Sequence, residues 1–183
     1  MRVVAGTARG IQLETLPGEE ITRPTINRVK EGMFSAVQFS VPGAMVLDLF
    51  AGSGQLGIEA LSRGAARCVF CDENPQAAAI VQKNCRAAGV FSQSKVVCMT
   101  AQALLAGTKE KFDLVLLDPP YGKEILQQIL PQVAGMVQPG GIVLCESELQ
   151  AQLPQEMEGL VLKKQYKYGT VQVSKYCKQE EQQ

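Results

Sequence analysis

The chain has 183 residues, of which 46% are hydrophobic and 20% are charged, and its 18 basic and 18 acidic residues leave no net charge. These values are ordinary for a soluble globular protein of one domain, which at this length can bury enough apolar surface to fold without disulfides or a structural metal. No stretch approaches the roughly 20 apolar residues of a membrane span and the first residues lack the apolar run of a signal peptide, so we expect a cytoplasmic protein.

Residues 1–43 are predicted to form an extension that precedes the main pattern. Two short β-like runs, Arg2–Ala5 and Ile11–Glu14, flank a turn that contains glycine, which indicates a small β-hairpin. A loop rich in Pro, Gly and Thr covers residues 15–25, and Thr25 can cap a helix that runs to about Phe39. We expect this extension to be followed by a second unit at 44–178 and by a frayed polar tail at 179–183.

From residue 44 onward, strand-like and helix-like segments alternate. The expected strands are Met45–Leu49, Arg67–Cys71, Lys95–Met99, Phe112–Leu117 and Ile142–Glu146. The expected helices between them are Gln55–Arg63, Pro75–Ala88, Ala101–Leu105 and Glu124–Val137. Two last runs, Leu160–Lys167 and Thr170–Cys177, predict an antiparallel hairpin at the sheet edge. This is the pattern of a doubly wound, mostly parallel α/β sheet, which binds ligands beyond the carboxyl ends of its strands.

A glycine-rich loop follows the first strand, in the stretch Asp48-Leu49-Phe50-Ala51-Gly52-Ser53-Gly54-Gln55-Leu56-Gly57. Its three glycines match G-x-G-x-x-G, a fingerprint of nucleotide cofactors that is weak when it stands alone. Asp48 favours one cofactor, because a carboxylate beside the glycines repels the pyrophosphate of NAD and attracts the ammonium and sulfonium of S-adenosylmethionine. We therefore predict that S-adenosylmethionine is bound by Asp48, Phe50, Ala51, Gly52, Ser53 and Gly54.

The next two strand ends supply further candidates for this cofactor. Asp72 lies about 20 residues beyond the glycines, where an acidic side chain can accept hydrogen bonds from both ribose hydroxyls, and Glu73 is its near rival. Thr100 and Ala101 follow the third strand and are expected beside the adenine. The hydroxyl of Thr100 is equally well placed to cap the next helix.

The most specific motif is Asp118-Pro119-Pro120-Tyr121, directly after the fourth strand. The two prolines hold the backbone extended and rigid, with carboxylate and carbonyl acceptors at fixed positions. Two such acceptors can take both hydrogens of an exocyclic amino group on a base, and the ring of Tyr121 can stack on that base. Methyl transfer from a sulfonium needs mostly positioning. The motif therefore predicts a methyltransferase that acts on a base amino group.

Further stretches narrow the function. They are Met1-Arg2-Val3-Val4-Ala5-Gly6 with Arg9-Gly10, Thr22-Arg23-Pro24-Thr25, Arg28-Val29-Lys30-Glu31, Leu61-Ser62-Arg63-Gly64-Ala65 and Tyr168-Gly169-Thr170. With the glycine loop and Asp118–Tyr121, they resemble the bacterial small-subunit (16S) rRNA guanine-N2 methyltransferases of the RsmD type over nearly the whole chain. The resemblance implies a seven-stranded Rossmann-like methyltransferase fold and N2 methylation of a guanine in small-subunit rRNA, naked or in an assembling ribosomal subunit. We expect a monomer.

RNA contacts are expected from both ends of the chain. Arg23 is predicted to lie near a flipped-out base, and Arg9, Arg28 and Lys30 are predicted to bind the RNA around it. Lys167 and Tyr168 belong to the carboxyl-terminal hairpin, where lysines alternate with tyrosines in a way that suits an unpaired strand. Basic residues are few, with 8 against 12 acidic residues in 44–160 and 5 against 2 in 161–183, which indicates few phosphate contacts.

The six cysteines are expected to be reduced thiols that pack as small hydrophobic side chains. Cys68 and Cys71 form a Cys-x-x-Cys pair, a spacing also used by zinc and redox sites. The chain has no histidine and no second paired-cysteine motif, so a four-ligand zinc site is hard to build. We predict no metal.

Three alternatives to the rRNA guanine-N2 methyltransferase are considered. A DNA or other RNA methyltransferase of adenine N6 or cytosine N4 could use the same Asp118–Tyr121 motif, but the chain has no room for a domain that reads DNA sequence. An NAD-dependent oxidoreductase conflicts with Asp48 and lacks any histidine for hydride transfer. An RNA-binding module without activity conflicts with the intact Asp118–Tyr121 motif.

Overall fold

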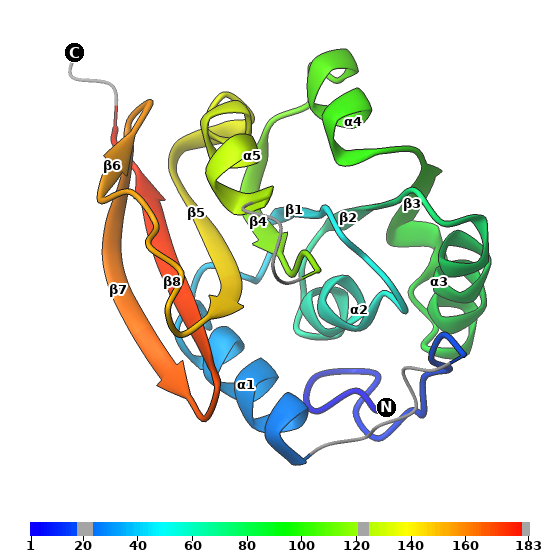
Figure 1. The fold of residues 1–183 in the computed structure, drawn as a ribbon. Coiled ribbons are helices and arrows are strands. Elements are labelled where there is room, and N and C mark those ends of the chain that lie inside the picture. Colours follow the sequence, from blue (N-terminus) through cyan, green and yellow to red (C-terminus); the bar gives the residue numbers. More distant parts are fainter. Residues whose placement is uncertain (18–23, 121–124, 181–183) are drawn as a thin grey trace.

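The computed structural model describes residues 1–17, 24–120 and 125–180, which form one sheet with helices on both faces (Figure 1). The strands are β1 (Met45–Asp48), β2 (Arg67–Asp72), β3 (Ser94–Cys98), β4 (Phe112–Leu117), β5 (Val137–Glu148), β6 (Glu156–Met157), β7 (Leu160–Tyr168) and β8 (Val171–Lys178). The doubly wound α/β class is confirmed. The expected number of seven strands is exceeded by β6, a two-residue strand that pairs with β7.

The strands are arranged in the order β3-β2-β1-β4-β5-β8-β7-β6. The five strands from β3 to β5 are parallel to one another, whereas β8 pairs antiparallel with both β5 and β7. The chain winds outward from β1 to β3 and then returns to place β4 on the other side of β1. The carboxyl ends of β1 and β4 therefore lie at the switch point of the sheet, where open α/β sheets bind their ligands.

Two layers of helices cover the sheet. The helices are α1 (Pro24–Ser35), α2 (Gln55–Ser62), α3 (Pro75–Ala87), α4 (Ala101–Gly107) and α5 (Ile125–Ala134), with a short 3-10 turn, η1 (Phe91–Gln93), after α3. Buried residues of α1, α2 and α3 pack on one face of the sheet, and those of α4 and α5 pack on the other (Figure 1). Because successive strand residues alternate between these two cores, each side chain at a strand end can be assigned to a face. No helix in the described ranges is both long and apolar enough to span a bilayer.

The amino-terminal segment differs from its prediction. Residues 1–14 make a single antiparallel bridge, between Arg2 and Gln12, and not a two-stranded hairpin. The backbone between them turns away because it bonds to α2, as described below. The following helix ends at Ser35, earlier than the expected Phe39, and a tighter bond from the Val37 amide to the Phe34 carbonyl begins a series of turns.

Two other element boundaries also moved. β5 extends beyond the expected Ile142–Glu146 at both ends, to Val137 and Glu148. α5 ends at Ala134 because Gly135 follows, and its expected first residue, Glu124, lies outside the described residues.

Candidate active site

Three aspartates lie at the carboxyl ends of neighbouring parallel strands, on one face of the sheet. Asp48 of β1 is level with Phe70 of β2 and with Leu116 of β4. Asp72 and Asp118 each follow two residues later, so both lie one step beyond Asp48. Phe70 and Leu116 belong to the core beneath α1, α2 and α3, and the two-residue alternation places all three carboxyl groups on that face.

The loop between β1 and α2 forms a tight turn at this edge. Gly52 and Gly54 have φ angles of +52° and +79°, a region that L side chains rarely adopt. A Cβ atom added to Gly52 would meet no described atom within 4 Å, so a ligand has room to approach the backbone there. Gly57 has a different role, because an added Cβ would lie 2.3 Å from the Phe70 ring. The third glycine of the motif thus permits close packing of α2 on the sheet.

Asp72 connects this loop to the end of β2. Its Oδ2 accepts a hydrogen bond from the Gly52 amide at 2.8 Å, and its Oδ1 accepts one from the Asn74 amide at 2.9 Å. The carboxylate is half-buried beside the glycines, whereas Glu73 is exposed at the turn into α3. The geometry therefore favours Asp72 over Glu73 as the residue that faces a cofactor on the loop.

Asp48 lies beneath the loop, with only 1% of its surface exposed. Its Oδ2 accepts a hydrogen bond from the Gly57 amide at 2.9 Å. Burial raises the pKa of this carboxyl to about 7, the Gly57 bond opposes that shift, and the charge of Asp72 adds to it. A carboxyl group in this state gains most from a ligand that carries positive charge.

Two buried oxygens of this region have no hydrogen-bond partner within the described residues. They are Oδ1 of Asp48 and Oε1 of Gln55, the first residue of α2. Orphaned buried polar atoms are uncommon and costly, and both of these are acceptors. The donor set that would satisfy them is an ammonium or another N–H group. The residues present therefore fit the charged amino acid part of S-adenosylmethionine.

The predicted adenine-binding residues at the end of β3 are only partly available. The Thr100 hydroxyl accepts a hydrogen bond from the Ala103 amide at 3.2 Å, so it caps α4, which was the alternative expected for it. Ala101 is buried in the core beneath α4 and α5. A contact between these residues and an adenine stays a prediction.

The predicted catalytic motif begins one strand away from Asp48. Asp118 is half-buried at the end of β4, Pro119 is buried, and Pro120 is exposed. Tyr121 lies outside the described residues. The part of the motif that is described thus faces the switch point between β1 and β4, next to the glycine loop.

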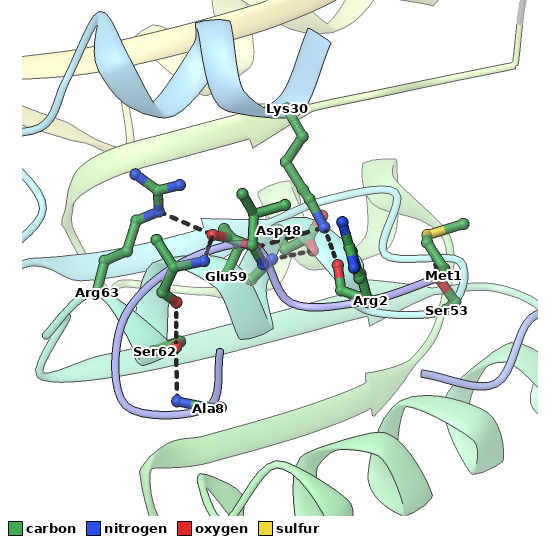
Figure 2. Close-up of polar contacts among 12 residues, drawn as sticks. Met1, Arg2, Ala8, Lys30, Asp48, Ser53, Glu59, Ser62 and Arg63 are labelled. Atoms are coloured by element: carbon green, nitrogen blue, oxygen red, sulfur yellow. Dashed lines mark hydrogen bonds and ion pairs between the residues drawn. The ribbon is translucent and has the colours of Figure 1, made fainter. Parts of the chain in front are cut away.

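Residues that the sequence reasoning missed attach the amino-terminal segment to this site. Glu59 of α2 is fully buried and accepts hydrogen bonds from the amides of Val4 and Ala5, at 2.8 and 2.9 Å (Figure 2). Ser62, one turn later, accepts from the Ala8 amide at 2.9 Å. The signal in the sequence was a single charged residue inside the otherwise apolar helix Gln55–Ser62.

A second connection passes through Asn84, which is 1% exposed on α3. Its amide group exchanges two hydrogen bonds with the backbone of Glu14, at 2.9 and 3.0 Å. The same side chain donates to the Ser53 carbonyl at 2.8 Å. Asn84 therefore holds the glycine loop and the amino-terminal segment together.

The prediction that Lys30 binds RNA is wrong. Lys30 is 2% exposed, its Nζ lies 3.4 Å from Oε2 of Glu59, and it donates to the Arg2 carbonyl at 2.7 Å (Figure 2). Burial lowers the pKa of its ammonium, against the opposing effect of Glu59. The side chain points inward because Lys30 belongs to the buried face of α1, next to Val29 and Met33.

The other predicted RNA-binding residues lie at the surface or outside the described residues. Arg9, Arg28 and Lys167 are exposed, and Arg23 lies outside the described residues. Tyr168 is half-buried against α1, where a Cβ on Gly32 would come within 1.9 Å of its hydroxyl. The ring is thus held against the helix that carries Arg28.

Residues 1–177 match the protein family described as "Conserved hypothetical protein 95". The chain is 36% identical, over 97% of its length and 99% of the relative's, to a Bacillus subtilis (strain 168) protein named "Putative rRNA methyltransferase YlbH". It is 33% identical to the "Ribosomal RNA small subunit methyltransferase D" of Haemophilus influenzae, over 81% of this chain and 79% of that protein.

Solved structures show the same fold. The "Putative methyltransferase yhhF from Escherichia coli" superposes with a TM-score of 0.86 at 28% identity, over 99% of both chains. A more distant structure, SMU.776, is described as a methyltransferase complexed with SAH. At 12% identity and a TM-score of 0.67, over 79% of this chain and 49% of that one, it is similar in fold alone.

Proposed function

The chain belongs to the RsmD family of methyltransferases, and we propose that it transfers a methyl group from S-adenosylmethionine to the exocyclic N2 of a guanine in small-subunit rRNA. The observation that carries this proposal is the position of Asp118-Pro119-Pro120. The motif lies at the sheet's switch point, one strand from the buried Asp48 and the glycine loop. A base bound by the motif and a cofactor bound by the loop would be neighbours.

Three groups of this chain would hold the cofactor. The open backbone at Gly52 admits the amino acid part, the orphaned oxygen of Asp48 supplies negative charge beneath it, and Asp72 accepts from the ribose. When bound, S-adenosylmethionine supplies a methyl carbon on a positive sulfur; the carbon–sulfur bond breaks as the nitrogen–carbon bond forms, sulfur keeps the electron pair, and one amino proton leaves.

Asp118 and the carbonyl of Pro119 hold the amino group of the base in this proposal. Both are acceptors, and together they take the two N–H groups and direct the nitrogen lone pair toward the cofactor. The rigid backbone of the two prolines fixes them in advance, which is the form of catalysis that methyl transfer needs most.

The RNA would lie across the surface that carries Arg9, Arg28 and Lys167, with Arg23 beside the target base. With so few basic residues, non-specific RNA binding should be weak and its salt dependence shallow, about −0.7 per neutralised phosphate on a log–log scale. Selectivity then depends on a folded rRNA site, including one displayed on an assembling subunit. The protein acts as a monomer in this proposal.

The test is incubation with labelled S-adenosylmethionine and 16S rRNA, both naked and in ribosomal subunits, followed by mapping of the modified base. We expect N2-methylguanine at one position. Asp118→Ala should keep its cofactor affinity in calorimetry and lose about 10²–10³ in turnover, the scale for one preorganised polar group. Label on adenine N6 or cytosine N4, a preference for duplex DNA, or full activity of the variant would contradict the proposal.

A further inference from the structure

Glu146 of β5 lies beside Asp118 at the same edge of the sheet. β5 is the parallel neighbour of β4, with Leu116 level with Leu144 and Leu117 level with Cys145. Continuing that register by one residue places Glu146 level with Asp118. Adjacent strands are about 4.8 Å apart, so the two residues occupy neighbouring positions.

The two carboxyl groups also face the same side. Leu144 packs in the core beneath α1, α2 and α3, and Cys145 packs in the opposite core. The alternation returns Glu146 to the face of Leu144, which is the face that Asp118 shares with Leu116. On its other side, Glu146 is paired with Val173 of β8, which is buried in the same core. Glu146 is half-buried, so its carboxyl group borders the site without being enclosed by the core.

The neighbouring position on the strand supports a ligand at this edge. Ser147 is 4% exposed, and its hydroxyl has no hydrogen-bond partner within the described residues. With Oδ1 of Asp48, it is a second polar group of the carboxyl edge that is buried and unsatisfied on the described part of the chain. The strand ends on both sides of Asp118 thus carry polar groups that the protein fold alone leaves without partners.

The chemistry of the bases distinguishes what two adjacent carboxylates can bind. Next to its exocyclic amino group, guanine carries a ring N1–H, which is a donor. Adenine and cytosine carry a bare ring nitrogen there, which is an acceptor. One carboxylate on the amino group and a second on the ring nitrogen therefore match guanine and repel the other two.

We propose that Glu146 is the residue that selects guanine, by accepting the N1–H bond while Asp118 accepts from the N2 amino group. This inference rests on the proposed function and adds a specificity residue that lies on a different strand from the Asp118–Tyr121 motif. An unpaired buried acceptor facing a bare ring nitrogen is expected to cost 10-fold to 100-fold in kcat/KM, the usual discrimination of a well-placed pair.

The test uses a small-subunit rRNA fragment whose target guanine has first been mapped with the wild-type protein. In a second fragment this guanine is replaced by 2-aminopurine, which keeps the N2 amino group but has a bare N1. Wild type should prefer the guanine fragment at least 10-fold in kcat/KM. Glu146→Gln can donate to the bare N1, so its preference should fall at least 10-fold. Glu146→Asp, which keeps the carboxylate, should retain the preference at a lower rate.

Glu148→Gln is the matched control, because Glu148 is an exposed acid two residues later on the same strand and should leave the preference unchanged. An unchanged guanine preference in Glu146→Gln overturns the inference. Loss of cofactor affinity in calorimetry, or a lowered unfolding temperature, would assign Glu146 a structural role and overturn it too. Absence of N2-methylguanine with the wild type contradicts the proposed function itself.

Discussion

Replacing Glu59 by glutamine should destabilise the whole protein, although the residue lies outside the proposed site. The side chain is fully buried. It accepts hydrogen bonds from two amides of the amino-terminal segment and from Nε of Arg63 at 2.9 Å, and Nζ of Lys30 lies 3.4 Å away. The substitution keeps the shape and removes the charge, so it isolates the electrostatic contribution.

The magnitude follows from what the substitution leaves behind. Lys30 is 2% exposed and would lose its counter-ion, while the new amide group would place N–H donors against the donors of the segment. Removing one partner of a buried ion pair costs about 3–5 kcal/mol. The total stability of a domain is about 5–15 kcal/mol, so this loss would be a large part of it.

Urea unfolding followed by circular dichroism measures this loss, with cofactor absent from both proteins. Glu110→Gln is the matched control, because its 2.6 Å pair with Lys95 is partly exposed and should be worth about 1 kcal/mol or less. Combining Glu59→Gln with Lys30→Met should cost less than the sum of the single changes, since the second removes the uncompensated charge. A loss from Glu59→Gln no larger than that of the control would refute the reasoning.

Three other predictions concern the cofactor loop. Asp72→Ala should lose about 1.5–3 kcal/mol of S-adenosylmethionine affinity in calorimetry, and Glu73→Ala should lose little; equal losses would contradict the choice of Asp72. Burial raises the pKa of Asp48 from 3.8 to about 7, so the folded protein keeps a proton that the unfolded chain releases. The unfolding free energy of the cofactor-free protein should therefore fall as the pH rises from about 4 to 7, and Asp48→Asn should flatten that slope; identical slopes would rule the assignment out. Asn84→Ala leaves the Ser53 carbonyl and the Glu14 backbone without their partner, and should cost about 1–3 kcal/mol of stability and weaken cofactor binding. Thermal unfolding and calorimetry measure both effects, and unchanged affinity would separate Asn84 from the loop.

The sequence predicted the features that depend on neighbouring residues. Continuous apolar runs predicted the five parallel strands, because a strand buried on both faces needs them. The glycine spacing predicted the turn at Gly52–Gly54, because only that backbone region requires glycine. The hydroxyl of Thr100 predicted its own cap. Each of these depends on a window of a few residues.

The features that were missed depend on residues far apart in the chain. Lys30 looked like a surface cation because nothing near it in sequence indicates Glu59, 29 positions later. The hairpin at 1–14 was overestimated for the same reason, since its amides bond to α2 in place of a second strand. The level of Glu146 beside Asp118 follows only from strand register, which composition does not determine.

The placement of β8 has a consequence for biosynthesis. β8 leaves the chain last among the strands, yet it lies between β5 and β7 and pairs with both. A nascent chain that has emerged only as far as β7 therefore has a gap in its sheet, and β5 exposes unpaired amides and carbonyls from Ile142 to Glu148. Open edges of this kind recruit strands from other chains. Translation that stalls before Val171 would leave an aggregation-prone intermediate, and the last eight-residue strand completes vectorial folding.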